Sequence, residues 1–538
     1  MRGIIAGLAL SLACLPAGAA NPNNGTTNNV PPHVRSQAQS YATQMVAAVN
    51  YIKLHYVRDV SKSALVEAAI QGLYETAREP LPAGLKGDLE RARIDQDYEQ
   101  ILQSAREQLG DREELRDQRA MIISLKAIPR VLDPYCGVAT PAELRRSYGD
   151  QTQHPLGLEL ESAFDNTPIL AEDEILPRGA RPRPVLRSGP YRISNVAPGS
   201  PAQRAGIKPG DLLTHIDDKP LDGPQASGLL QRLLQVGEGD GSKIIFTLTR
   251  AGQSKPLHLE VIAMPFIAET VFGINRRDDN TWNFMLDPIG KIGYIRLGFI
   301  DSSAPQEMSD ALNELKASGM RGLILDLRGN PGGMVTPATE VASLFVASGD
   351  IAIIRSPGRR EAPQGPFAPP PQGAPQGFEP GEQRYQADGS ARAIGDFPMV
   401  VLVNQETMGG GEMIASAIQD HHRGVLVGQR TFGKGSVQNT PTNFPGGVQF
   451  KITTGMFSRP NGKPLQRLSD SKPSDDWGVR PSRGMEFPMS LEVSKRLKEW
   501  MQWQTLRPGD SREILPLDDP DNDPQRQFAL RELRKMLK

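Results

Sequence analysis

Two glycine-rich segments contain the candidate catalytic residues of this sequence. The first, Thr407-Met-Gly-Gly-Gly-Glu412, is typical of a tight turn from a strand into a helix, with Glu412 favourably placed at the helix N-terminus. The second, Thr431-Phe-Gly-Lys-Gly-Ser-Val-Gln438, contains Lys434 between two glycines. A lysine can act as a base near pH 7 only if desolvation lowers its pKa by about 3 units. Without such surroundings, Lys434 would be an ordinary lysine in a glycine turn.

Short apolar runs predict the strands of the region that carries these segments. From Lys291 onward they alternate with helical stretches, an order that indicates a mixed α/β core. A Pro/Gly-rich stretch over 356–381 interrupts the core and is interpreted as a surface insertion. We assign the core to 265–490 and expect a helical extension over 491–538, with an amphipathic helix at 525–537. The expected strands cover 293–297, 322–326, 398–403 and 424–427.

The first half of the chain divides into a helical part and a β-rich part. Apolar residues recur at helical spacing between 36 and 150, which predicts a helical N-terminal domain. Residues 154–264 contain short β-like runs separated by glycine and proline, which predict a small β-rich domain. The predicted fold class is therefore multidomain α+β.

The β-rich part contains a sequence motif that is typical of a known domain. The run from Val196 to Asp217, which includes Ala-Pro-Gly-Ser-Pro-Ala and Lys-Pro-Gly-Asp, resembles the PDZ signature. The resemblance implies that Leu156-Gly157-Leu158 presents backbone N–H groups to a peptide carboxylate, while the peptide adds a strand beside a helix at 225–234. The alternative is a PDZ fold whose groove is blocked or used for internal docking, and the insertion over 161–190 could shield it.

Four further stretches resemble the C-terminal processing (tail-specific) serine proteases, a family that carries a PDZ domain. With the PDZ-like motif and the N-terminal helices, the similarity covers most of residues 40–485. Residues 133–136, Asp-Pro-Tyr-Cys, match the family's Asp-Pro-Tyr-Ser with Cys136 in the serine's place. The other three stretches are 322–333, 403–412 and 431–438.

The resemblance implies a serine-type endopeptidase with a Ser/Lys dyad, but one member of the dyad is absent. Lys434 matches the family's base, and Gln438 matches the glutamine that orients it. The position of the catalytic serine is Gly409, and the spacing to the lysine, 434 − 409 = 25, agrees with the family. Gly409 has no hydroxyl, so no acyl-enzyme can form there.

Other parts of such a site do not depend on the serine side chain. Backbone N–H groups of Gly332 or Gly333 and of Gly410 could still form an oxyanion hole. The hydroxyls considered as substitute nucleophiles are those of Thr407, Ser416 and Ser436, and none has a position that favours it.

The N-terminus predicts export to the periplasm or the extracellular space. An arginine, an apolar run and small residues up to Ala20 are typical of a secretory signal peptide over 1–20. We expect residues 21–35 to form a disordered leader. Cleavage would leave Cys136 as the only cysteine and exclude an intramolecular disulfide. No later apolar stretch is long enough for an integral membrane segment.

Composition argues against several partners. The chain has 61 basic and 62 acidic residues, which gives no overall field to hold nucleic acid. The seven histidines form no ligand-spaced cluster, so neither a metal nor a cofactor is implied.

Three functions remain open. The first is an exported endopeptidase that captures unfolded or C-terminally exposed polypeptide tails and cleaves them with Lys434 and an unconventional nucleophile or water. The second is a pseudoprotease that binds tails without cleaving them. The third is a structural envelope protein that only uses the fold.

Overall fold

The structure is a computed structural model. It describes residues 30–139, 156–160, 164–165, 185–186, 189–356, 381–468, 471–503 and 522–538, except 198, 223–225, 227–228, 231–240, 265, 267–268, 278–280, 442–443 and 446–447. The predicted signal peptide, most of the predicted leader and the inserted stretch at 357–380 lie outside the described residues.

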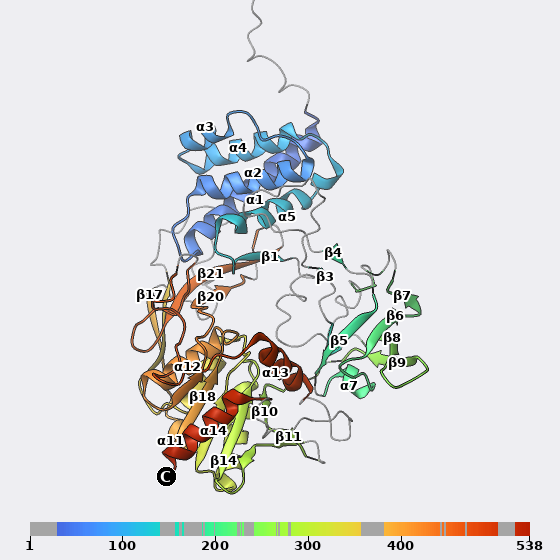
Figure 1. Ribbon diagram of the computed structural model, residues 1–538. Helices are drawn as coiled ribbons and strands as arrows, with labels where there is room; N and C mark the ends of the chain where they lie inside the picture. The colour runs from blue at the N-terminus through green and yellow to red at the C-terminus, as the bar shows by residue number, and fades with distance from the viewer. Residues whose placement is uncertain are drawn as a thin grey trace, which may run out of the picture.

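The N-terminal helices form their own layer at the top of Figure 1. The first helix begins at Pro32, four residues before the predicted start of the helical region. Ser61 caps the second helix, since its side chain accepts a hydrogen bond from the amide of Ala64. The helices are α1 (Pro32–His55), α2 (Lys62–Ala77), α3 (Leu85–Arg91), α4 (Asp95–Gln108) and α5 (Arg119–Ala127), with 3-10 turns at Glu113–Leu115 and Ile128–Val131.

A mixed sheet forms the centre of the lower body. Its strands β14 (Ile292–Leu297), β15 (Gly322–Asp326), β18 (Met399–Val403) and β19 (Val425–Gly428) are parallel neighbours in that order. They are almost entirely apolar because helices cover both faces of the sheet. Short β10 (Val271–Phe272) and β13 (Met285–Asp287) pair with β14. The helices α9 (Ala304–Ala317), α10 (Val335–Ser343) and α12 (Gly410–Asp420) share one apolar core with this sheet.

The C-terminal helix covers the other face of the central sheet, and in this position it is part of the core. Helix α14 (Pro524–Met536) lies on the sheet (Figure 1), and its Leu530 and Leu533 share an apolar core with the strands. Arg328 anchors the start of the helix, since its buried guanidinium binds Asp326 and Asp523. The predicted helix at 525–537 is therefore present, but it is packed on the sheet.

A second sheet joins the central body to the N-terminal helices. The long strand β21 (Gln449–Ser458) pairs with β1 (Gly137–Ala139), β16 (Asp350–Ser356) and β20 (Ser436–Asn439), and β17 (Gly381–Gln386) pairs with β16. Phe450 and Ile452 of β21 lie in the same apolar core as the N-terminal helices. The predicted helical region therefore ends before β1, which belongs to this sheet.

The β-rich part forms a separate lobe to the right in Figure 1. Its antiparallel sheet has the order β2-β5-β6-β8-β9, which leaves β2 as an outer strand. The bounds are β2 (Leu158–Leu160), β5 (Tyr191–Val196), β6 (Leu212–Ile216), β7 (Lys219–Pro220), β8 (Lys243–Thr249) and β9 (Leu257–Ile262), with α7 (Pro201–Arg204) after β5. The remaining elements are β3 (Phe164–Asp165), β4 (Val185–Leu186), β11 (Asn275–Arg276), β12 (Trp282–Asn283), α11 (Ala391–Ile394) and α13 (Leu491–Trp503).

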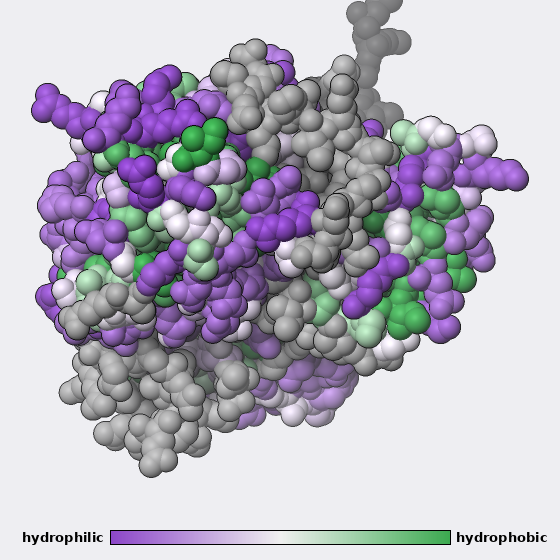
Figure 2. Space-filling model, turned by 90° about the horizontal axis from the view of Figure 1, so that it is seen from below, coloured by the Kyte–Doolittle hydropathy of each residue, from purple (hydrophilic) through white to green (hydrophobic). Residues whose placement is uncertain are grey.

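The predicted fold class, multidomain α+β, is confirmed. The face shown in Figure 2 is mainly hydrophilic, with smaller hydrophobic areas between. No helix in the described part of the chain is both long and apolar enough to cross a membrane.

Candidate active site

The turn between β18 and α12 has the backbone of a sharp elbow. Gly409 is the N-cap of α12, with φ 54° and ψ −114°. Residues other than glycine rarely adopt this backbone conformation, and those that do are found mostly at functional sites. A Cβ at Gly409 would nevertheless meet only ordinary contacts, at 3.7 Å from Gly332 Cα and 3.9 Å from Pro331 O. The elbow therefore has room for a side chain that this sequence lacks.

A second turn, after β15, lies against the elbow. A Cβ at Gly332 would lie 2.9 Å from the amide nitrogen of Gly410, and one at Gly333 would lie 1.8 Å from Ile300 O. Only glycine permits this approach of two backbones. The amide of Gly332 is already used, because it donates to Asn330 Oδ1 at 2.8 Å.

The amides of Gly333 and Gly410 differ from that of Gly332. In the part of the chain that the structure describes, neither has a hydrogen-bond acceptor. Two such donors from neighbouring turns are what stabilisation of an oxyanion requires. That role stays a prediction for Gly333 and Gly410, and the geometry favours Gly333 over Gly332.

Glu412 connects the elbow to the lysine segment. Its carboxylate is fully buried and accepts hydrogen bonds from the amides of Gly409 (3.1 Å), Gly433 (2.7 Å) and Lys434 (2.8 Å) and from Thr431 Oγ1 (2.5 Å). Burial raises the pKa of Glu412 to about 7, and the four donors oppose that rise. From the sequence we expected Glu412 only to favour the helix N-terminus, so this bridging role was missed. Its position three residues after Gly409 was the available signal.

Lys434 is placed beside the elbow by this shared carboxylate. The amides of Lys434 and Gly409 bind the same oxygen, Glu412 Oε2, which holds the two segments side by side. Burial lowers the pKa of Lys434, and the negative charge of Glu412 partly opposes the shift. The ammonium nitrogen lies 5.5 Å from the centre of the Tyr135 ring. The direction of the shift is the one that a lysine base needs.

Gln438 lies on β20, where its side chain has other partners. Its Nε2 donates to Ser436 Oγ at 2.8 Å and to Thr453 Oγ1 at 3.3 Å. Its predicted role in orienting Lys434 therefore stays a prediction.

Cys136 is close to the same cluster but belongs to the core under the N-terminal helices. Its Sγ lies 3.7 Å from Thr453 Oγ1 and accepts from the amide of Thr453. Burial raises the pKa of Cys136 to about 11, so the thiol stays protonated near pH 7 and is a poor nucleophile.

Comparison with known families agrees with this geometry. The model of peptidase family S41 matches residues 291–473, which include both turns and the lysine segment, and a PDZ domain model matches residues 192–247. Residues 291–473 belong to peptidase family S41. The predicted resemblance to the C-terminal processing proteases with a PDZ domain is confirmed.

Characterised relatives bear related names. A carboxyl-terminal-processing protease of Synechocystis sp. is 28% identical over 296 residues, 54% of this chain and 58% of that protein. The chloroplastic C-terminal processing peptidase of Tetradesmus obliquus is 29% identical over 51% of this chain and 54% of that protein. CtpA of Bacillus subtilis, a carboxy-terminal processing protease, is 27% identical over 405 residues, 75% of this chain and 70% of its own length. The first two matches span little more than half of each relative.

Similarity to solved structures is weaker. The photosystem II D1 C-terminal processing protease is 21% identical, and the match covers 84% of this chain and 93% of that one with a TM-score of 0.42. A score at this level supports no further conclusion.

Each hydroxyl considered as a substitute nucleophile forms hydrogen bonds with other groups of this S41 domain. Thr407 is fully buried, and its Oγ1 donates to Leu327 O at 2.8 Å and accepts from the amide of Asn404. Ser416 is buried within α12, where it donates to Met413 O. Ser436 accepts from Gln438 on β20. None of the three lies at the elbow position.

The PDZ domain places its predicted peptide-binding loop beside the outer strand. Gly157 has φ 69°, and a Cβ there would lie 2.1 Å from Ser200 Cβ, so only glycine fits. The carbonyl oxygens of Leu156 and Gly157 accept from the amides of Ala202 and Ala197, which ties the loop to the start of α7. Leu158 begins β2. Of the predicted helix at 225–234, the described residues Ala226, Leu229 and Leu230 are helical and pack in the PDZ core.

Proposed function

We propose that this S41-family protein binds polypeptide tails without cleaving them, as a pseudopeptidase. The observation that carries the proposal is Gly409 at the elbow, where the backbone is shaped for a nucleophile and no hydroxyl or thiol is present. Acyl transfer needs a covalent nucleophile at this point. The hydroxyls of the neighbouring residues point into other hydrogen bonds.

The PDZ domain supports the binding half of the proposal. A peptide can extend an antiparallel sheet at an outer strand, and β2 has this position. The glycine loop before β2 would place backbone amides near the peptide carboxylate. We therefore propose unfolded or C-terminally exposed polypeptide tails as the partners. Export, through a signal peptide over residues 1–20, belongs to the same proposal.

One observation favours a second candidate function. The half-buried Lys434, whose pKa is lowered, would have no use in a protein that only binds tails. In an active endopeptidase, the neutral amine would remove a proton from water, and the water would attack a carbonyl held by the amides of Gly333 and Gly410. The C–O bond would form, the peptide C–N bond would break, and the Lys434 ammonium would return the proton to the leaving amine. This candidate keeps the base and the oxyanion donors but replaces the covalent step with direct hydrolysis.

The two candidates are separated by incubating the mature protein with a fluorescent peptide that ends in apolar residues. We expect its fluorescence anisotropy to rise on binding, and its mass to stay unchanged after prolonged incubation. The same peptide with an amidated C-terminus should bind more weakly, because it lacks the carboxylate. Cleavage that disappears in Lys434→Ala would instead establish the endopeptidase. Equal binding of the free and the amidated peptide would contradict recognition of tails.

A further inference from the structure

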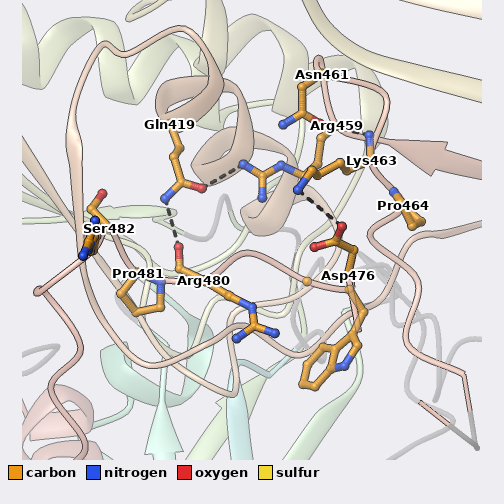
Figure 3. A pocket seen from close by; sticks show the side chains of 12 residues that line it. Gln419, Arg459, Asn461, Lys463, Pro464, Asp476, Arg480, Pro481 and Ser482 are labelled. Atoms are coloured by element: carbon orange, nitrogen blue, oxygen red, sulfur yellow. Dashed lines mark hydrogen bonds and ion pairs between the residues drawn. The ribbon is translucent and has the colours of Figure 1, made fainter. Parts of the chain in front are cut away.

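A cavity of about 290 Å³ lies near the C-terminal end of α12 (Figure 3). It is bounded by Gln419 near the end of α12, by the segment after β21 and by residues 476–483. Gln419 holds two of these walls together: its side chain accepts from Arg459 Nη2 and donates to Arg480 O, as Figure 3 shows. The cavity is thus built by hydrogen bonds between distant parts of the chain.

The charge of the lining is one-sided. Four basic side chains and one acidic side chain line the cavity: Arg459, Lys463, Arg480, Arg483 and Asp476. A second hollow of about 680 Å³ shares Gln419, Arg459, Asn461 and Ser482 with the first and adds one basic side chain, Arg423, and one acidic side chain, Asp420. Among the arginine, lysine and aspartate side chains of the two adjoining hollows, five are basic and two are acidic, which gives a net charge of +3.

Two of these five cations lack a carboxylate partner among the residues that the structure describes. A third, Arg423, lies 3.8 Å from Asp396, which is outside the lining. Arg480 Nη2 donates to the backbone carbonyl of Pro473 at 2.5 Å, and no carboxylate in the described ranges forms an ion pair with it. Arg483 is exposed, and no residue in the described ranges forms an ion pair with it. By contrast, Arg459 pairs with Asp420, and Lys463 lies 3.3 Å from Asp476.

The adjacent wall adds further positive charge. Arg430 and Arg467 lie over the Trp477 ring, 3.4 Å and 4.7 Å from its centre. Burial, and then the neighbouring positive charge of Arg480, lower the pKa of Arg430 to about 10. The negative charges of Asp476 and Asp475 oppose that shift, so three arginines, Arg430, Arg467 and Arg480, lie together here with two acids.

The same wall supports the lysine segment. A Cβ at Gly478 would lie 2.9 Å from Thr431 Oγ1 and 3.4 Å from Glu412 Oε1, and one at Gly433 would lie 3.0 Å from Trp477 Cε3. Val479 also donates its amide to Thr431 Oγ1 at 2.7 Å. A ligand that moves Trp477 or Gly478 would therefore also shift the segment that carries Lys434.

We propose that the two joined hollows are a binding site for an extended acidic peptide segment. The net positive charge selects acidic side chains. Two adjoining hollows of this size suit several residues of a peptide better than a single small anion. The site is separate from the PDZ groove and does not depend on tail binding.

The test uses a fluorescein-labelled peptide of alternating aspartate and glutamate with an amidated C-terminus, so that the PDZ domain has no carboxylate to bind. We expect saturable binding by fluorescence anisotropy, and none for the matching asparagine/glutamine peptide. Arg483→Glu should weaken binding about fivefold, the upper range for one exposed charge pair. Lys86→Glu is the matched control, because Lys86 is exposed on α3 in the N-terminal helices and carries the same charge.

Tryptophan emission provides a second measurement that locates the ligand. Binding should change the emission of the wild type, and Trp477→Phe should lose that change while the anisotropy signal persists. Equal affinities of Arg483→Glu, Lys86→Glu and the wild type would overturn the proposal. Displacement of the peptide by inorganic phosphate at a similar concentration would also overturn it, since it would indicate a site for small anions.

Discussion

Replacing Gly409 with serine is the most direct test of the elbow. The serine would keep a backbone with φ 54° and ψ −114°, which costs about 1–3 kcal/mol for a residue other than glycine. The lower flexibility of the unfolded chain offsets about 0.4–1 kcal/mol of this cost. No steric term is added, because the nearest atom to the new Cβ is 3.7 Å away. We therefore expect Gly409→Ser to fold, with a free energy of unfolding lower by at most about 2.6 kcal/mol.

The matched control is Gly409→Ala, which has the same backbone strain and no hydroxyl. Both variants should unfold at the same urea concentration, but only Gly409→Ser should hydrolyse an unfolded protein substrate. Lys434→Ala in the serine background should lower the rate by about 10³-fold or more. The rate should rise with pH through the lowered pKa of Lys434, because the neutral amine is the base. If Gly409→Ser is as stable as Gly409→Ala but shows no activity that depends on Lys434, the idea of an otherwise assembled site is wrong.

Three further predictions concern stability. Lys434→Met should raise the melting temperature at pH 7, because burial of the charged amine lowers the folded-state pKa of Lys434 and so destabilises the folded protein. This penalty is present at low pH and is relieved as the pH rises toward 10.5. The difference in melting temperature between the two proteins should therefore shrink at high pH. Gly333→Ala should lower the free energy of unfolding, measured with urea, by more than about 3 kcal/mol, because the new Cβ would lie 1.8 Å from Ile300 O. A smaller loss would mean that the turn can move. Asp523→Ala should cost about 3–5 kcal/mol by leaving the buried guanidinium of Arg328 with an incomplete set of partners, and an unchanged urea midpoint would contradict that account.

The amino-acid sequence predicted several of the strands, the family resemblance and a glycine at the position expected for the nucleophile. The strand expected at 322–326 matches β15, and the one at 398–403 matches β18 within one residue. These predictions succeed because buried strands and tight turns have local signatures of apolar runs and glycines. The absent hydroxyl at Gly409 also follows from residue identity and spacing, which need no coordinates.

The contacts that hold the site together became visible only in the folded chain. Glu412 binds Lys434 and Gly409, which are 25 residues apart, and Gln438 turns toward Thr453 on β21. Such contacts depend on strand order and on how loops cross the sheet edge, and neither leaves a pattern in neighbouring residues. We expected α14 to be an extension because its sequence shows an apolar face but does not show which surface that face will cover.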